Sequence, residues 1–149
     1  MNRVLDGFSG KLRTGIHVCR GNWSKREDVL ITGDDQPLVD CFREMNVDQL
    51  VLEYATPRAG ELEVIGRALS DREIGLGCVN PRTDVAESVE SIVERSREAM
   101  QYWSPESIFL NPDCGFGCFA NRCVNEENIA AAKLKAMVEA AKVLRSDVL

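Results

Sequence analysis

Short, continuously apolar segments alternate along the chain with segments in which apolar residues recur at helical spacing. The apolar segments predict strands that are buried on both faces, over residues 14–19, 49–54, 74–79 and 107–112. The periodic segments predict helices, over residues 36–45, 61–69, 85–103 and 128–146. Each predicted helix returns the chain to the start of the next strand, so we expect the strands to pair in parallel. The pattern predicts an α/β fold of (βα)4 type, with residues 1–149 as a single domain.

Polar residues mark where two of these helices are expected to begin. Asp84 precedes the segment 85–103, and Asn125 or Glu126 precedes the segment 128–146. Such side chains accept hydrogen bonds from the free amides of a first helical turn. We therefore expect the third helix to start directly after Asp84.

Composition and charge narrow the classes of partner. The 149-residue chain is 44% hydrophobic, which is enough for a buried core. Its net charge of −6 argues against nucleic acid and anionic membrane surfaces, because phosphate groups are bound by clustered Lys and Arg. The sequence has neither a run of about 18 apolar residues nor an apolar N-terminal signal segment. We expect a cytoplasmic protein that binds no nucleic acid and no membrane.

The six cysteines are expected to be reduced, as buried thiols or metal ligands, because no export signal is recognised. They are Cys19, Cys41, Cys78, Cys114, Cys118 and Cys123. Cys41 lies in a predicted helix and Cys78 in a predicted strand, so both are expected in the core. Cys118 and Cys123 follow Cys114 in the pattern C-x3-C-x4-C, which lacks a fourth ligand. We interpret these two as unligated thiols.

The only histidine, His17, lies two residues from Cys19 at the end of the first predicted strand. Glu53 lies near the end of the second strand, and Cys114 follows the fourth. The carboxyl ends of parallel strands form the face where ligands bind, and residues two apart on a strand share a face. One imidazole, two thiolates and one carboxylate suit tetrahedral Zn²⁺. The pattern thus favours a zinc site.

Each of these residues also has a simpler interpretation. His17 could be a buried histidine bonded to a backbone carbonyl, and the cysteines could be small core residues. Glu53 could be a surface carboxylate or the partner of Arg58, although an unpaired buried carboxylate costs several kcal/mol. On spacing alone, the metal and the structural interpretations both stay open.

Three longer motifs carry a family resemblance, namely H-V-C-R-G-N at 17–22, L-E-Y-A-T-P-R-A-G at 52–60 and L-N-P-D-C-G-F at 110–116. In this order they resemble the C-terminal catalytic barrel of the cobalamin-independent methionine synthase family. The resemblance runs from about residue 3 to residue 145. It implies a TIM-type (β/α)8 barrel, of which this chain matches only the last four units.

The resemblance implies a zinc-dependent S-methyltransferase. Its zinc ligands, carried over by position, are His17, Cys19, Glu53 and Cys114. In the family the metal activates a substrate thiol, and a methyl group passes from 5-methyltetrahydrofolate, or methyltetrahydropteroylglutamate, to homocysteine in methionine biosynthesis. Related enzymes use other thiols, such as coenzyme M with an epoxide. Two further possibilities stay open: a zinc- or thiol-binding fragment without activity, and an interaction subunit whose cysteines are structural.

Residues close to the ligand positions are candidates for substrate contacts. Arg20, Arg58 and Asp113 are the candidate substrate-binding residues. The arginines could bind a substrate carboxylate in bidentate fashion or form ion pairs instead. Trp23 and Tyr54 could stack on a pterin or pack in the core or at its rim.

The match to half a barrel also predicts an assembly. In the family, most contacts to the amino acid and much of the folate site come from the first four barrel units. A half barrel leaves unpaired strand edges at 14–19 and 107–112, and we expect apolar surface on its interior side. A second copy or another chain is expected to complete the barrel, as a homodimer or a heteromer.

Overall fold

A four-stranded parallel sheet forms the centre of the molecule. The structure, a computed structural model, describes residues 2–8, 10–22 and 24–148, apart from the side chains of Glu27, Cys118 and Val148. The strands pair in chain order and are β1 (Gly15–Val18), β2 (Gln49–Glu53), β3 (Glu73–Val79) and β4 (Ile108–Pro112). The predicted parallel α/β fold is therefore confirmed.

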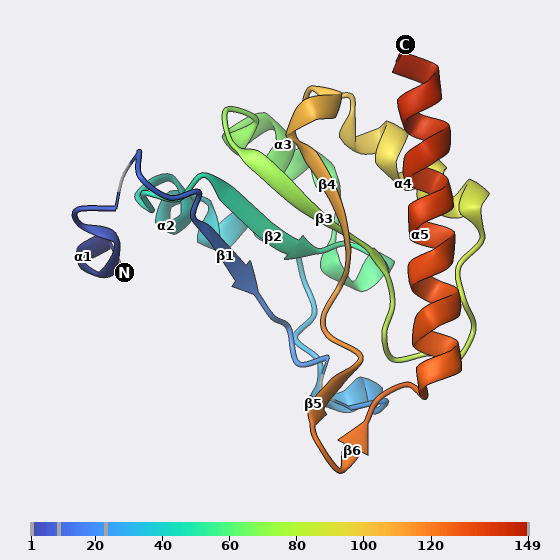
Figure 1. Cartoon of the computed structure of the whole chain (residues 1–149). Coiled ribbons are helices and arrows are strands. Elements are labelled where there is room, and N and C mark those ends of the chain that lie inside the picture. Colours follow the sequence, from blue (N-terminus) through green and yellow to red (C-terminus); the bar gives the residue numbers. More distant parts are fainter. Residues whose placement is uncertain (1, 9, 23, 149) are drawn as a thin grey trace.

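A short helix precedes the first strand, and a longer one follows each of the four strands along the chain. They are α1 (Asn2–Leu5), α2 (Val39–Arg43), α3 (Leu62–Leu69), α4 (Val89–Ala99) and α5 (Glu127–Val148). Single 3-10 turns are η1 (Glu27–Val29), η2 (Gln36–Leu38), η3 (Pro57–Ala59) and η4 (Pro105–Ser107). An antiparallel hairpin of β5 (Gly117–Phe119) and β6 (Arg122–Cys123) connects β4 to α5. Figure 1 shows α5 beside α4 and β4, with the hairpin beyond the carboxyl end of β4.

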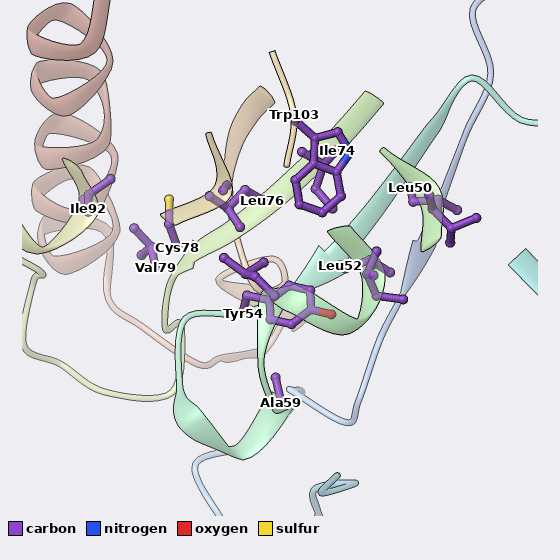
Figure 2. Close-up of a cluster of buried hydrophobic side chains, with 14 of the residues drawn as sticks. Leu50, Leu52, Tyr54, Ala59, Ile74, Leu76, Cys78, Val79, Ile92 and Trp103 are labelled. Carbon is purple, nitrogen blue, oxygen red and sulfur yellow. The ribbon is translucent and has the colours of Figure 1, made fainter. Parts of the chain in front are cut away.

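The register of the sheet gathers aliphatic side chains on the face that packs against the helices. Residues paired in register between parallel strands point to the same face. Two rows of four on this face are Ile16, Leu50, Ile74 and Ile108, followed by Val18, Leu52, Leu76 and Leu110. All eight belong to or pack against the core. Figure 2 shows Leu50, Leu52, Ile74 and Leu76 of these rows among other core residues such as Tyr54, Ile92 and Trp103. Tyr54 is thus a core residue, and Trp23 lies outside the described residues.

The opposite face of the sheet, here called the polar face, carries small and polar side chains. Its rows are Gly15, Gln49 and Glu73, then His17, Val51, Gly75 and Phe109, then Glu53, Gly77 and Asn111. Arg13 pairs with Glu73 at 2.5 Å, and its guanidinium lies 4.1 Å from the centre of the Phe109 ring. The expectation of an apolar interior side is therefore wrong, because most of its positions are occupied by Gly, Gln, Glu, His and Asn.

Two of the strands are less buried than their apolar sequences predicted. In β1, exposed residues alternate with half-buried ones, and β4 is half-buried or exposed throughout. Within the described residues each of these strands has a neighbour on one side only, whereas β2 and β3 have neighbours on both sides. The prediction of burial on both faces holds for the central strand β3 and is wrong for the two edge strands.

Helix α4 begins later than predicted. Its N-cap is Ser88, whose hydroxyl accepts a hydrogen bond from the amide of Ser91 at 3.1 Å. The backbone carbonyls of Asn80 and Val85 instead accept hydrogen bonds from the buried ammonium of Lys133, at 3.0 and 2.6 Å. This segment is therefore held outside the helix, and the expected start after Asp84 is wrong.

The remaining predictions about single elements have mixed outcomes. Helix α5 begins directly after Glu126, as predicted. Cys78 is buried as expected, whereas Cys41 is exposed, because α2 turns only Val39 and Phe42 inward. Cys123 is exposed on β6, and the side chain of Cys118 lies outside the described residues. In the described part of the chain, no helix combines the length and the apolar character needed to cross a membrane.

Candidate metal centre

The structure brings the four predicted donors together at the carboxyl end of the sheet. His17 lies in β1, and Cys19 is the first residue after that strand. Glu53 is the last residue of β2, and Cys114 comes two residues after β4. One ligand atom from each of the four lies within 4.8 Å of the ligand atoms of the others. Parallel pairing explains the convergence, because it brings the carboxyl ends of all the strands to one edge.

The distance between the two sulfurs agrees with tetrahedral coordination. Sγ of Cys19 lies 3.9 Å from Sγ of Cys114. Bonds of about 2.3 Å at a tetrahedral angle would separate two zinc-bound sulfurs by about 3.8 Å. The amide of Gly21 also donates a hydrogen bond to Sγ of Cys19 at 3.4 Å, which holds that sulfur in place. The donor set and its spacing therefore fit Zn²⁺.

The hydrogen bond of His17 leaves one ring nitrogen for a metal. Nδ1 lies 3.2 Å from the backbone carbonyl of Val51. A carbonyl only accepts, so in the neutral imidazole this contact places the proton on Nδ1 and the lone pair on Nε2. Metal-binding histidines are commonly oriented in this way. His17 does bond a backbone carbonyl, as its structural interpretation proposed, but the side chain is exposed instead of buried.

Glu53 is a buried carboxylate with donors on both oxygens. Oε1 accepts from the backbone amide of Arg20 at 2.9 Å. Oε2 accepts from Nδ2 of Asn22 and, at 3.4 Å, from the guanidinium of Arg58. The interpretation of Glu53 as a surface carboxylate is wrong, since its exposed fraction is 1%. Its partnership with Arg58 is confirmed as an ion pair and is compatible with a metal at the same carboxylate.

The three candidate substrate residues make contacts inside the protein. The buried guanidinium of Arg20 donates to Asp35 at 2.6 Å and to the carbonyls of Gly33 and Ala59. Arg58 donates to the carbonyl of Ile31 at 2.8 Å in addition to Glu53. For both arginines the geometry favours the ion-pair interpretation. Direct contact with a substrate stays a prediction.

Asp113 supports the segment that follows Glu53. Its Oδ1 accepts hydrogen bonds from the backbone amides of Tyr54 and Ala55, at 3.0 and 2.9 Å. Burial raises the pKa of the Asp113 carboxyl to about 7, although these amides act in the opposite direction. Gly77 makes room for the carboxyl, because a Cβ at that position would lie 2.3 Å from Oδ1. Asp113 therefore joins β4 to the end of β2 beside the donors.

Two residues around the donors were not predicted as part of the site. Asn22 is fully buried and contacts Glu53. Asp35 accepts from Arg20 and, at 2.9 Å, from the hydroxyl of Tyr54. Burial raises the pKa of Asp35, and the guanidinium of Arg20 opposes that shift. The position of Asn22 at the end of the motif H-V-C-R-G-N was the one sequence signal that pointed to it.

Comparison with known proteins connects this arrangement to a family. Residues 14–143 match the family described as cobalamin-independent synthase, catalytic domain. The methionine synthase of Pyrococcus horikoshii is 31% identical over 147 residues, which cover 99% of this chain and 37% of that protein. The methionine synthase of Thermococcus kodakarensis is 30% identical, with 99% and 38% covered. The chain thus spans well under half the length of these relatives.

A solved structure supplies the matching fold. The B12-independent methionine synthase from Shewanella sp. W3-18-1, in complex with selenomethionine, superposes with a TM-score of 0.83 at 17% identity. The superposition covers 99% of this chain and 42% of that one. The fold is accordingly a (βα)4 half of a TIM-type (β/α)8 barrel. Since the family match covers most of the chain, the protein belongs to the cobalamin-independent synthase catalytic-domain family.

Proposed function

We propose that this chain is the zinc-binding half of a methionine-synthase-type methyltransferase, with residues 1–149 corresponding to units five to eight of the catalytic barrel. The observation that carries the proposal is the convergence of one imidazole, two thiols and one carboxylate at one end of the sheet. The family match supports it independently. A cytoplasmic location is part of the proposal, because cysteines stay reduced there and are available as metal ligands.

The chemistry of the proposed site is the activation of a thiol. Zn²⁺ bound by His17, Cys19, Glu53 and Cys114 would lower the pKa of a substrate thiol and supply a nucleophile at neutral pH. Two of the proposed ligands are oriented by hydrogen bonds. The carbonyl of Val51 orients His17, and three hydrogen-bond donors hold Glu53. His17 and Cys19 are exposed, so a small thiol can approach them from solvent.

The proposed substrates are a homocysteine-like thiol as acceptor and a methylfolate as methyl donor. The names of the relatives, which are methionine synthases, support this choice. A relative that uses another thiol, such as coenzyme M with an epoxide, would share the same metal chemistry. Assays with each thiol separate these two possibilities.

A second candidate is a zinc- or thiol-binding fragment without activity of its own. It is favoured by the internal contacts of Arg20, Arg58 and Asp113, and by the 37% of the relative's length that the chain spans. Methyl transfer by the chain with its completing partner, compared with the chain by itself, distinguishes the two candidates. A fragment would stay inactive in both conditions.

Completion of the barrel is also part of the proposal, as a homodimer or a heteromer. The edges of β1 and β4 are available for pairing within the described part of the chain. Beside β4 runs a groove of about 670 Å³ between that strand, helix α5 and the segment that follows α4. Its apolar lining includes Ile108, Leu110, Met137, Val138 and Ala141. A further parallel strand with aliphatic side chains toward the helices would fill this groove.

Metal analysis of the purified chain tests the proposal. We expect about one Zn²⁺ per chain, and a strong loss of zinc in Cys114→Ser, because a hydroxyl is a far poorer zinc ligand than a thiolate. Cys41→Ser is the matched control, since Cys41 is exposed on α2 and does not belong to the donor group. Stoichiometric zinc in both Cys19→Ser and Cys114→Ser would rule out the assignment.

A further inference from the structure

A chain of hydrogen bonds leads from the loop after β3 to the carboxylate of Glu53. Nε of Arg82 donates to Oδ1 of Asn22 at 2.7 Å, and Nδ2 of Asn22 donates to Oε2 of Glu53. Asn22 and Glu53 are at most 1% exposed, and Arg82 is 6% exposed. In a buried site of this kind water does not replace a lost hydrogen bond easily, so each contact is consequential.

The guanidinium of Arg82 determines which way the Asn22 amide points. A guanidinium has donors and no acceptor, so the Asn22 atom that faces Nε must be the oxygen. The NH₂ group of Asn22 is consequently directed at Glu53. Arg82 thus removes the ambiguity between the two orientations of a side-chain amide.

The donors around Glu53 are distributed unevenly over its two oxygens. Oε2 accepts from Asn22 and from Arg58, which fills the two lone-pair positions of that atom. Oε1 accepts only from the amide of Arg20 among the hydrogen bonds found in the described residues. One lone pair of Oε1 is therefore left for a metal.

We propose that Asn22, oriented by Arg82, is a positioning residue that fixes Glu53 as a ligand through a single oxygen, Oε1. The inference rests on the proposed zinc site and names the residue that sets the geometry of one ligand. A carboxylate free to rotate could bind through one or both oxygens, which would alter the coordination number. Groups that hold a ligand in place contribute to metal affinity without touching the metal.

Zinc affinity and the visible spectrum of the Co²⁺-substituted chain test this role. We expect Asn22→Ala to weaken Zn²⁺ binding by about 10- to 100-fold, measured against a competing chelator, and to shift the Co²⁺ ligand-field bands. Asn22→Asp keeps the volume of the side chain and removes the donor that faces Glu53, so the same loss is expected. Wild-type affinity and an unchanged spectrum in either variant would overturn the inference.

A matched control and a double-mutant cycle separate positioning from a general loss of structure. Asn125 is similarly buried, and its Nδ2 donates to Thr83 and Asp84, away from the donors. Asn125→Ala is expected to keep the affinity and the spectrum of the wild type. If Asn22 acts through Glu53, its removal in a Glu53→Gln background should have little further effect on zinc affinity. A full additional loss there would contradict the inference.

The same measurements distinguish a failure of this inference from a failure of the proposed function. A wild-type chain that takes up neither Zn²⁺ nor Co²⁺ in stoichiometric amount contradicts the metal site itself. A wild-type chain that binds both metals, with no response to Asn22 substitution, contradicts only the positioning role.

Discussion

Glu53 is the candidate ligand that most needs hydrogen-bond partners, because burying a carboxylate without them costs several kcal/mol. Three hydrogen-bond donors surround it instead, namely the backbone amide of Arg20 and the side chains of Asn22 and Arg58. None of these donors lies on β2, so the ligand depends on the loops that follow β1 and β2. The polar environment that stabilises the carboxylate also limits how it can face a metal.

The thiol of Cys78 provides a prediction about pH at the scale of one residue. Burial raises the pKa of Cys78 to about 12, and its Sγ donates to the carbonyl of Asn111 at 3.6 Å. At pH 8 an ordinary thiol is about one quarter thiolate, whereas a thiol with this pKa is ionised to the order of one part in ten thousand. We expect iodoacetamide to modify the exposed Cys41 and to leave Cys78 unmodified.

Peptide mass spectrometry after timed alkylation checks this expectation. At about pH 9.5 Cys78 should still be spared, because the pH stays well below its raised pKa. Denaturant supplies the control, since unfolding should make both thiols reactive. Equal modification of Cys41 and Cys78 in the folded chain would contradict the burial of Cys78.

At the same scale, the convergence of the candidate donors and the pairing of Glu53 with Arg58 could be predicted, whereas the roles of Asn22 and Asp35 could not. Parallel strands made it possible to infer that the ends of β1, β2 and β4 meet, and they do. Asn22 makes its contacts with residues 31 and 60 positions away. Contacts between such distant residues leave no periodic signal, so the role of Asn22 became visible only in three dimensions.

At the scale of elements, the apolar pattern predicted the strands well and the start of α4 badly. The aliphatic rows of β2 and β3 belong to the core, as their continuous sequences indicated. Val85 fits the helical period of the following segment, yet it is 72% exposed and lies outside α4. The tertiary contact with Lys133 overrides the local pattern here, because its ammonium binds the carbonyl of Val85.

Lys133 should therefore be a strong contributor to stability. Its side chain is completely buried, and Nζ donates to two carbonyls and, at 3.1 Å, to Glu87. Lys133→Met leaves these acceptors unsatisfied, and we expect the free energy of unfolding to fall by about 3 kcal/mol. Urea denaturation measures the change.

Lys142→Met is the matched control for this substitution. Lys142 lies on the same helix and pairs with Glu139 at 2.8 Å, but its side chain is 62% exposed. The loss of such an exposed pair should change the free energy of unfolding by less than about 1 kcal/mol. Similar effects of the two substitutions would show that Lys133 does not anchor the segment before α4.

At the scale of the whole molecule, the apolar features that favour association lie along the two edge strands, β1 and β4. The polar face carries His17 and Glu53 together with glycines and polar side chains, so it offers little apolar area for association. The groove beside β4 is apolar, and Val138 within it is 52% exposed. Strand β1 offers the half-buried Ile16 and Val18 on the face that would continue the aliphatic rows of β4.

The last prediction follows from these two complementary edges. We expect the chain to sediment at micromolar concentration as a species larger than its monomer of 16.6 kDa, with β1 of one copy beside β4 of another. Val138→Glu should weaken this association, because it introduces a charge into the apolar groove. Val143→Glu is the control, since Val143 is exposed on the same helix and does not line the groove. A monomer with a cooperative melt would contradict the closure of the barrel by a second copy and mean that the isolated half barrel is stable with its strand edges open.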